Sequence, residues 1–282
     1  MVTDIQNKTK KAPFFIFGCP RSGTSLLSRL LNNHPNIAVP YESHLLNTFL
    51  KHVDYYGDLA KSKNVRRLVK DILLTDVIQS WHPSLSEDDI LKNIDEHSFK
   101  GVFEAVLESW MQKNGKVRWG EKTPHHIDYW QILMDFFPNG RFLIIHRDGR
   151  DVALSLVKAR FGPKTVYQAA HFWRNYLDKV NRFKLQLSGK QILEISYEKL
   201  LDDPENMLTH VCKFIGEDFS KEMLRFYECE SYYRTDKKNL QNLRRPIIKN
   251  NTKKWRTGMS DYDIYLFQQI AGEDLKKYGY KL

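Results

Sequence analysis

The chain has 282 residues, an apolar content of 41% and a formal net charge of +10, from 44 Lys and Arg against 34 Asp and Glu. This apolar content is typical of globular domains and excludes a disordered chain, while the positive charge favours an anionic ligand, an acidic acceptor, a membrane surface or a nucleic acid. Cys19, Cys212 and Cys229 are widely spaced and form no CxxC pair, which argues against a zinc site and against a disulfide framework.

The N-terminal segment, residues 1–13, is polar and carries several lysines. The apolar run Phe14–Cys19 that follows it is too short for a signal sequence or a membrane span. We therefore expect a cytoplasmic protein without a transmembrane segment, with a flexible N-terminus over about residues 1–12.

A strand, a glycine loop and a helix follow in order. Phe14–Gly18 is a continuous apolar run that ends in glycine, which is typical of a buried strand. The leucines within Leu26–Leu31 recur at helical spacing, and Pro35 ends that helix. This pattern predicts the first half of a βαβ unit.

The loop between them, Gly18–Ser25, has the length of a Walker A phosphate-binding loop. Backbone N–H groups at a helix N-terminus attract an anion, and glycine at Gly23 lets the backbone approach it closely. A nucleoside triphosphatase has lysine where this chain has Thr24, and the basic residue here is Arg21. The loop therefore favours an anion other than a magnesium-bound triphosphate, although a tight turn without a ligand would have a similar composition.

Two further strands are predicted at Arg141–His146 and Ile192–Ser196, with a helix starting at Gly149 after the first of them. Strands that alternate with helices predict an α/β fold, with a central parallel sheet flanked by helices and a P-loop-like nucleotide site. We expect a single domain over residues 1–282, in which the helical insertions 43–116 and 161–188 form the acceptor side. A capping box at Ser260 begins the last helix.

A second anion site is predicted where the strand Arg141–His146 ends. Ligands of open parallel sheets bind at the carboxyl ends of the strands, so Arg147 lies at the ligand edge, and Ser155 follows two helical turns later. An arginine fork and a serine hydroxyl both suit a phosphate. Taken alone, this stretch also fits an ordinary charged helix start; together with the glycine loop it favours a nucleotide with two separated anions.

These motifs resemble the family of sulfotransferases that use 3′-phosphoadenosine 5′-phosphosulfate (PAPS). Pro20–Leu27 is similar to the family's 5′-phosphosulfate loop, and Arg147 with Ser155 to its 3′-phosphate site. The resemblance runs from about Phe14 to the C-terminus and is closer to the protein-tyrosine sulfotransferases and their bacterial relatives than to the aryl and steroid branch. It implies the sulfotransferase fold, PAPS as co-substrate and no metal.

The resemblance also implies roles for individual residues. The implied nucleotide-binding residues are Arg21, Ser22, Gly23, Thr24 and Ser25 for the 5′-phosphosulfate, Arg147 and Ser155 for the 3′-phosphate, Tyr197 near the nucleotide, and Arg245 and Lys254 in a C-terminal segment that folds over it. Glu42 matches the catalytic glutamate of the tyrosine branch. Lys122 matches the lysine that, with Arg21, neutralises the transferring group. The aryl branch uses a histidine after this lysine, so His125 is left open as the base.

The expected function is transfer of a sulfuryl group to a hydroxyl acceptor. A carbohydrate, a lipid, a phenol such as a peptide tyrosine, and a small metabolite all remain open as acceptors, and so does assembly into a homo-oligomer. One alternative is a P-loop kinase-like phosphotransferase, but this chain lacks the phosphate-loop lysine that such an enzyme needs. A nucleic-acid binder is the other, but the aromatic residues occupy apolar-periodic positions, so no nucleic-acid partner is expected.

Overall fold

The computed structural model describes residues 11–160, 162–228 and 243–282. Within these residues the strands are β1 (Phe14–Phe17), β2 (Ile37–Ala38), β3 (Arg118–Glu121), β4 (Arg141–His146) and β5 (Ile192–Ser196). They form a sheet in the order β2-β3-β1-β4-β5, and every neighbouring pair is parallel. The three strands predicted from apolar runs are confirmed, and β2 and β3 are additional.

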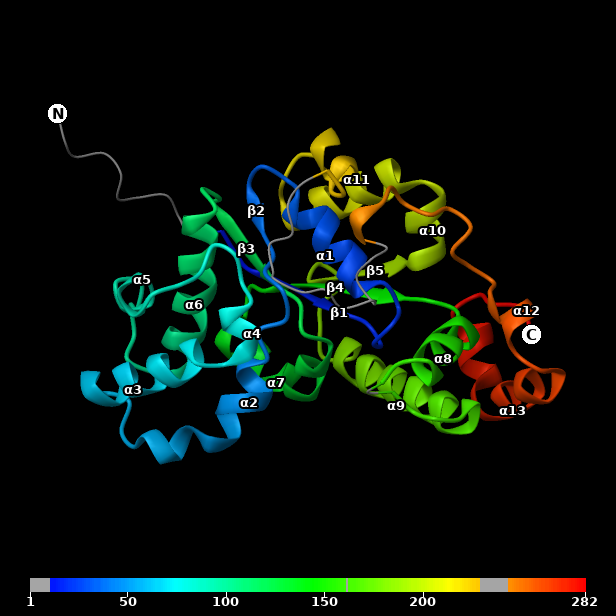
Figure 1. The fold of residues 1–282 in the computed structure, drawn as a ribbon, viewed down its shortest axis with the longest axis horizontal. Coiled ribbons are helices and arrows are strands. Elements are labelled where there is room, and N and C mark those ends of the chain that lie inside the picture. Colours follow the sequence, from blue (N-terminus) through cyan, green and yellow to red (C-terminus); the bar gives the residue numbers. More distant parts are fainter. Residues whose placement is uncertain (1–10, 161, 229–242) are drawn as a thin grey trace.

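Helices cover both faces of this sheet (Figure 1). The α-helices are α1 (Thr24–Asn32), α2 (Leu45–Phe49), α3 (Ser62–Leu73), α4 (Asp76–Gln79), α5 (Glu87–Leu91), α6 (Phe99–Lys113), α7 (Trp130–Phe136), α8 (Gly149–Val157), α9 (Val166–Lys184), α10 (Tyr197–Asp202), α11 (Pro204–Ile215), α12 (Trp255–Gly258) and α13 (Asp261–Lys277). The predicted α/β class with a flanked parallel sheet is therefore confirmed.

Alternation along the strands divides the interior into two cores. In β1, Phe14 and Ile16 pack with α1, α10 and α11, whereas Phe15 and Phe17 join the core that contains α6, α8 and α9. All four side chains are completely buried. Successive strand residues point to opposite faces, so a run that is apolar at every position fits a central strand with helices on both sides.

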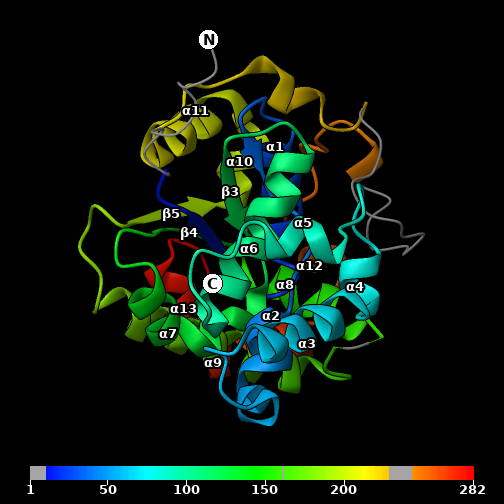
Figure 2. The same ribbon diagram turned by 90° about the vertical axis from the view of Figure 1, so that its left-hand side faces the viewer.

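The segment 43–116 contains the helices α2 to α6. Figure 2 turns this group of helices toward the viewer. Helix α9 occupies most of the second predicted insertion, 161–188. Ser260 caps α13 by accepting a hydrogen bond from the backbone N–H of Asp263. Most of the predicted flexible N-terminus, residues 1–10, lies outside the described residues.

Candidate active site

One candidate residue lies just beyond the carboxyl end of each described strand. Lys122, Arg147 and Tyr197 directly follow β3, β4 and β5. Arg21 and Glu42 come four residues after the ends of β1 and β2. Because the strands are parallel, these ends meet at one edge of the sheet. The fold thus gathers residues that are distant in sequence.

The glycine loop turns tightly between β1 and α1. The N–H of Ser22 donates to the carbonyl of Cys19 at 2.9 Å, and Arg21 and Gly23 have left-handed φ angles of 77° and 102°. Gly23 has no room for a side chain, since an added Cβ would lie 2.4 Å from the Tyr197 ring. The backbone at the start of α1 therefore stays open to an anion.

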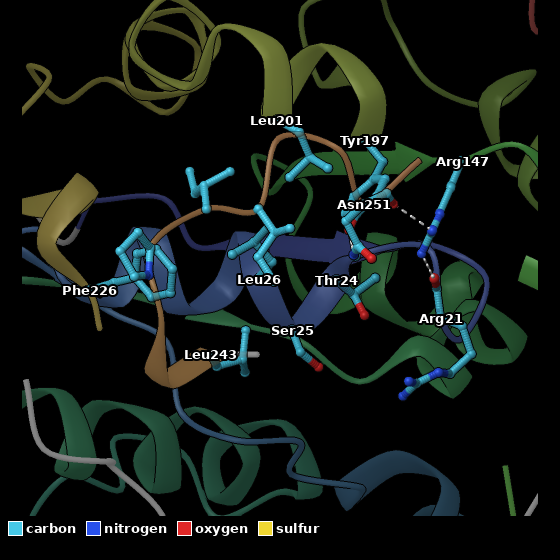
Figure 3. Close-up of a pocket in the computed structure, with 14 residues that line it drawn as sticks. Arg21, Thr24, Ser25, Leu26, Arg147, Tyr197, Leu201, Phe226, Leu243 and Asn251 are labelled. Carbon is cyan, nitrogen blue, oxygen red and sulfur yellow. Dashed lines mark hydrogen bonds between the residues drawn. The ribbon is translucent and has the colours of Figure 1, made fainter. Parts of the chain in front are cut away.

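A pocket that is open to solvent lies along this loop and α1 (Figure 3). Its lining residues are Arg21, Gly23, Thr24, Ser25, Leu26, Arg147, Tyr197, Leu201, Phe226, Leu243, Pro246, Ile247, Ile248 and Asn251. One end is polar and carries the two arginines, whereas the other is formed by leucine, isoleucine and phenylalanine side chains (Figure 3). A ligand with anionic groups and an apolar ring suits this arrangement.

Arg147 is held at the polar end by several contacts. Its guanidinium lies over the Tyr197 ring at 4.4 Å and donates to the backbone carbonyls of Arg21, at 3.3 Å, and Asn251, at 2.9 Å (Figure 3). It also pairs with Asp151 at 3.2 Å. The side chain of Asn251 donates to the Tyr197 hydroxyl at 2.6 Å. Sequence reasoning missed Asn251, which lies in a basic run without a recognisable motif.

Unsatisfied polar groups suggest that this end accepts an anion. The Ser22 hydroxyl and Arg147 Nε are buried and find no hydrogen-bond partner in the described part of the chain. Burial and the nearby charge of Arg147 both lower the pKa of Arg21. A phosphate or sulfate between the two arginines would relieve their repulsion and supply acceptors for the open donors.

The remaining predicted nucleotide residues occupy different positions. Ser155 accepts a hydrogen bond from Arg21 Nε at 2.9 Å, so the two predicted anion sites adjoin each other. Ser155 itself does not line the pocket. Arg245 and Lys254 are exposed and lie outside the lining. Lys254 precedes Trp255, whose ring is covered by the Arg150 guanidinium at 3.7 Å.

Glu42 and Lys122 meet beside the glycine loop. Lys122 Nζ lies 2.6 Å from Glu42 Oε1 and 3.5 Å from the Ser25 hydroxyl. The side chain of Lys122 is 1% exposed, whereas that of Glu42 is 20% exposed. A buried cation thus links the carboxylate to the loop that lines the pocket. Glu42 Oε2 lies 3.1 Å from His44 Nε2.

Charge keeps Glu42 ionised. Burial acts to raise the pKa of Glu42, but the charge of Lys122 and hydrogen bonds from His44 and Lys122 outweigh it and hold the pKa well below its usual range. The side chain of His125 reaches solvent and lies close enough to Glu42 to interact with its charge. Partial desolvation of the ring lowers the pKa of His125. Glu42 is therefore an ionised carboxylate and His125 remains a second candidate base.

A buried network around Glu121 fixes the backbone on both sides of the Glu42–Lys122 pair. The Glu121 carboxylate accepts from the hydroxyls of Ser43, at 2.8 Å, and Thr123, at 2.6 Å, and lies 3.0 Å from His126 Nδ1. Burial would raise the pKa of Glu121, but His126 and these hydroxyls lower it to about 2. Because Ser43 adjoins Glu42 and Thr123 adjoins Lys122, this network fixes the backbone positions from which the two side chains meet.

The described residues contain neither a metal-binding cluster nor a membrane-spanning helix. No group of three or more His, Cys, Asp and Glu side chains is arranged to hold a metal ion within residues 11–160, 162–228 and 243–282. In the same ranges, no helix combines the length and the apolar character needed to cross a membrane.

The fold and the loop define an α/β protein with a P-loop-like anion site, and comparison with known proteins gives the family. Residues 13–221 match the model of the sulfotransferase family. The chain therefore belongs to the sulfotransferase family.

Several relatives agree with this assignment. Protein-tyrosine sulfotransferase 2 of Gallus gallus is 25% identical over 78% of this chain and 55% of its own length. Nodulation protein NoeE of Sinorhizobium fredii is 22% identical over 93% of this chain and 64% of its own length. The sulfotransferase domain of the Synechococcus PCC 7002 olefin synthase has the same fold, with a TM-score of 0.66, 22% identity and 98% of both chains covered. This chain thus spans less than two thirds of both curated relatives.

Proposed function

We propose that this protein transfers a sulfuryl group from PAPS to a hydroxyl acceptor. The observation that carries the proposal is the adjacency of three features: the glycine loop, the Arg147–Tyr197 end of the pocket, and the Glu42–Lys122 pair beside Ser25. The family and the fold support it. The kinase-like alternative is not favoured, because Thr24 replaces the phosphate-loop lysine.

In this proposal the pocket holds the nucleotide. The N–H groups and hydroxyls of Ser22–Ser25, with Arg21, bind the 5′-phosphosulfate, and Arg147 with Ser155 binds the 3′-phosphate. The apolar end around Leu26 and Phe226 accommodates the adenine ring. Arg245 and Lys254 contribute from the exposed side. No metal is needed, since side-chain cations neutralise the charge.

Glu42 acts as general base. As the acceptor oxygen forms its bond to sulfur, its proton moves to the Glu42 carboxylate, and the bond between sulfur and the phosphate oxygen breaks. Lys122 and Arg21 neutralise charge on the sulfuryl and bridging oxygens. When the sulfuryl oxygens attract Lys122, its hold on Glu42 weakens and the carboxylate becomes a stronger base.

The acceptor belongs to the hydroxyl class, as a carbohydrate, lipid, phenol or small metabolite, and its site lies on the side of residues 43–116 and 161–188. A cytoplasmic location is part of the proposal, because Cys19 and Cys212 are free and buried, as in reducing compartments. The deciding experiment incubates the protein with radiolabelled PAPS and a panel of such acceptors. Label transfer supports the proposal, whereas tighter binding of ATP with magnesium than of 3′-phosphoadenosine 5′-phosphate (PAP) would favour a kinase.

Replacing Gly23 by alanine should abolish PAP binding, because the new Cβ would overlap the Tyr197 ring and the backbone φ is 102°. Titration calorimetry measures the affinity. Gly115→Ala is the matched control: Gly115 also has positive φ, at 66°, but its Cβ would meet no atom within 4 Å. That variant should bind PAP like the wild type. Equal affinities in all three proteins would contradict the assigned loop.

Arg147→Gln should weaken PAP about 10- to 100-fold and leave AMP almost unaffected, because only PAP carries the 3′-phosphate that this guanidinium is proposed to bind. The ratio of the two dissociation constants is the readout. An equal loss of affinity for both nucleotides would show that Arg147 does not bind the 3′-phosphate and instead supports the structure of the pocket.

A further inference from the structure

His44 contacts Glu42 and is anchored on its other side. Its Nε2 lies 3.1 Å from Glu42 Oε2, and its Nδ1 lies 3.3 Å from Asn47 Nδ2. The backbone N–H of His44 donates to the Thr123 hydroxyl at 3.4 Å. The imidazole therefore bridges the carboxylate and the first turn of α2, and its side chain is 26% exposed to solvent.

The backbone of His44 is in a conformation that non-glycine residues rarely adopt. Its φ and ψ are 54° and 14°, in the left-handed region. Such a residue persists where surrounding contacts determine its position, and these residues concentrate at functional sites. Here the contacts with Thr123 and Asn47 hold the ring against Glu42.

The contacts define where the ring proton lies. Glu42 is an ionised carboxylate, which can only accept, so His44 Nε2 must carry hydrogen. The Asn47 side-chain amide lies 3.3 Å from Nδ1 and supports the ring on its other side. The ring therefore donates to Glu42 from Nε2.

We propose that His44 is a positioning residue for Glu42: its ring holds the carboxylate in the orientation needed for proton abstraction. This inference rests on the proposed sulfuryl transfer. A hydrogen bond from Nε2 to Oε2, together with Lys122 on Oε1, fixes the carboxylate plane.

Other titratable groups face this pair and must be separated from His44. Lys122 contacts Glu42, and His125 interacts with both Glu42 and His44. Asp128 and Lys179 in turn face His125. His125 is therefore the competing histidine, and desolvation lowers the pKa of His125.

Two variants at the same position test the role. His44→Gln keeps a side-chain N–H that can reach Glu42, whereas His44→Leu has none, and both share the backbone strain of the original residue. Turnover is measured as PAP released from PAPS, with an acceptor that takes up label in the panel described above. PAP affinity is measured alongside.

We expect His44→Leu to lower kcat about 10- to 100-fold without a change in PAP affinity, since a hydrogen bond to a charged group is lost outside the nucleotide pocket. His44→Gln should retain most of the turnover, because its amide N–H can replace the donor to Glu42. His52→Leu, an exposed histidine that stacks on Tyr55, should behave as wild type.

Nitrogen-15 NMR of the ring gives a readout independent of turnover: His44 Nε2 should carry a proton. An unprotonated Nε2, or wild-type kcat in His44→Leu, would overturn the inference while leaving the proposed function intact. A wild-type protein that transfers label from PAPS to no acceptor of the panel would instead contradict the proposed function, and the inference with it.

Discussion

Glu42→Gln is expected to reduce turnover by about 100- to 10,000-fold while PAP binds as it does to the wild type. The amide cannot take the acceptor's proton, yet it has nearly the same size as the carboxylate and can still accept a hydrogen bond from Lys122. Glu42 also lies outside the lining of the nucleotide pocket, so the affinity for PAP should not depend on its charge.

The measurement combines kcat from radiolabelled PAPS with the PAP dissociation constant from calorimetry. Glu87→Gln is a suitable control, because this glutamate pairs with Arg66 and Lys70 at the surface of the helical segment. Its kcat should match that of the wild type. Full turnover in Glu42→Gln would remove Glu42 as the base, and His125→Gln would then test the remaining candidate.

Lys122→Met is expected to lower kcat about 100- to 1000-fold, the usual effect of losing one donor aimed at developing charge. It should also change the pH dependence. Lys122 holds the pKa of Glu42 down against the effect of burial, so without this lysine that pKa rises. The residual turnover should therefore fall as pH is lowered through the mildly acidic range, where wild-type Glu42 stays ionised.

Lys122→Arg is the matched variant, because it keeps the charge and should keep Glu42 ionised. Rates across pH and thermal unfolding midpoints are measured for both, since a half-buried carboxylate without its cation also destabilises the fold. A Lys122→Met protein that is folded and turns over PAPS at the wild-type rate would exclude Lys122 from charge neutralisation.

Local sequence predicts β1, β4 and β5 but not β2 and β3. β1 and β4 are apolar runs in the interior of the sheet and β5 is a mainly apolar strand at its edge, whereas β3 reads Arg-Trp-Gly-Glu. Its Arg118 is buried because it pairs with Glu217 at 2.8 Å, and Gly120 packs against the Phe14 ring. These partners are distant in sequence, so the strand has no local signature.

The same distinction holds for the candidate site, whose residues were predictable only where the preceding strand could be recognised. Arg21 and Arg147 follow recognisable strands, so the strand-end rule was sufficient to nominate them. Glu42 and Lys122 follow the two unrecognised strands, and only the family resemblance indicated them. The apolar end of the pocket brings Phe226 together with Leu26 through tertiary packing, which periodicity cannot reveal.

A crystal structure with PAP bound tests the central claim most directly. The account predicts one nucleotide molecule in the pocket of Figure 3, with its 5′-phosphate on the loop Arg21–Ser25 and its 3′-phosphate within hydrogen-bond distance of Arg147 or Ser155. PAP bound elsewhere, or with only one of its phosphates at these groups and the other directed away into solvent, would contradict it.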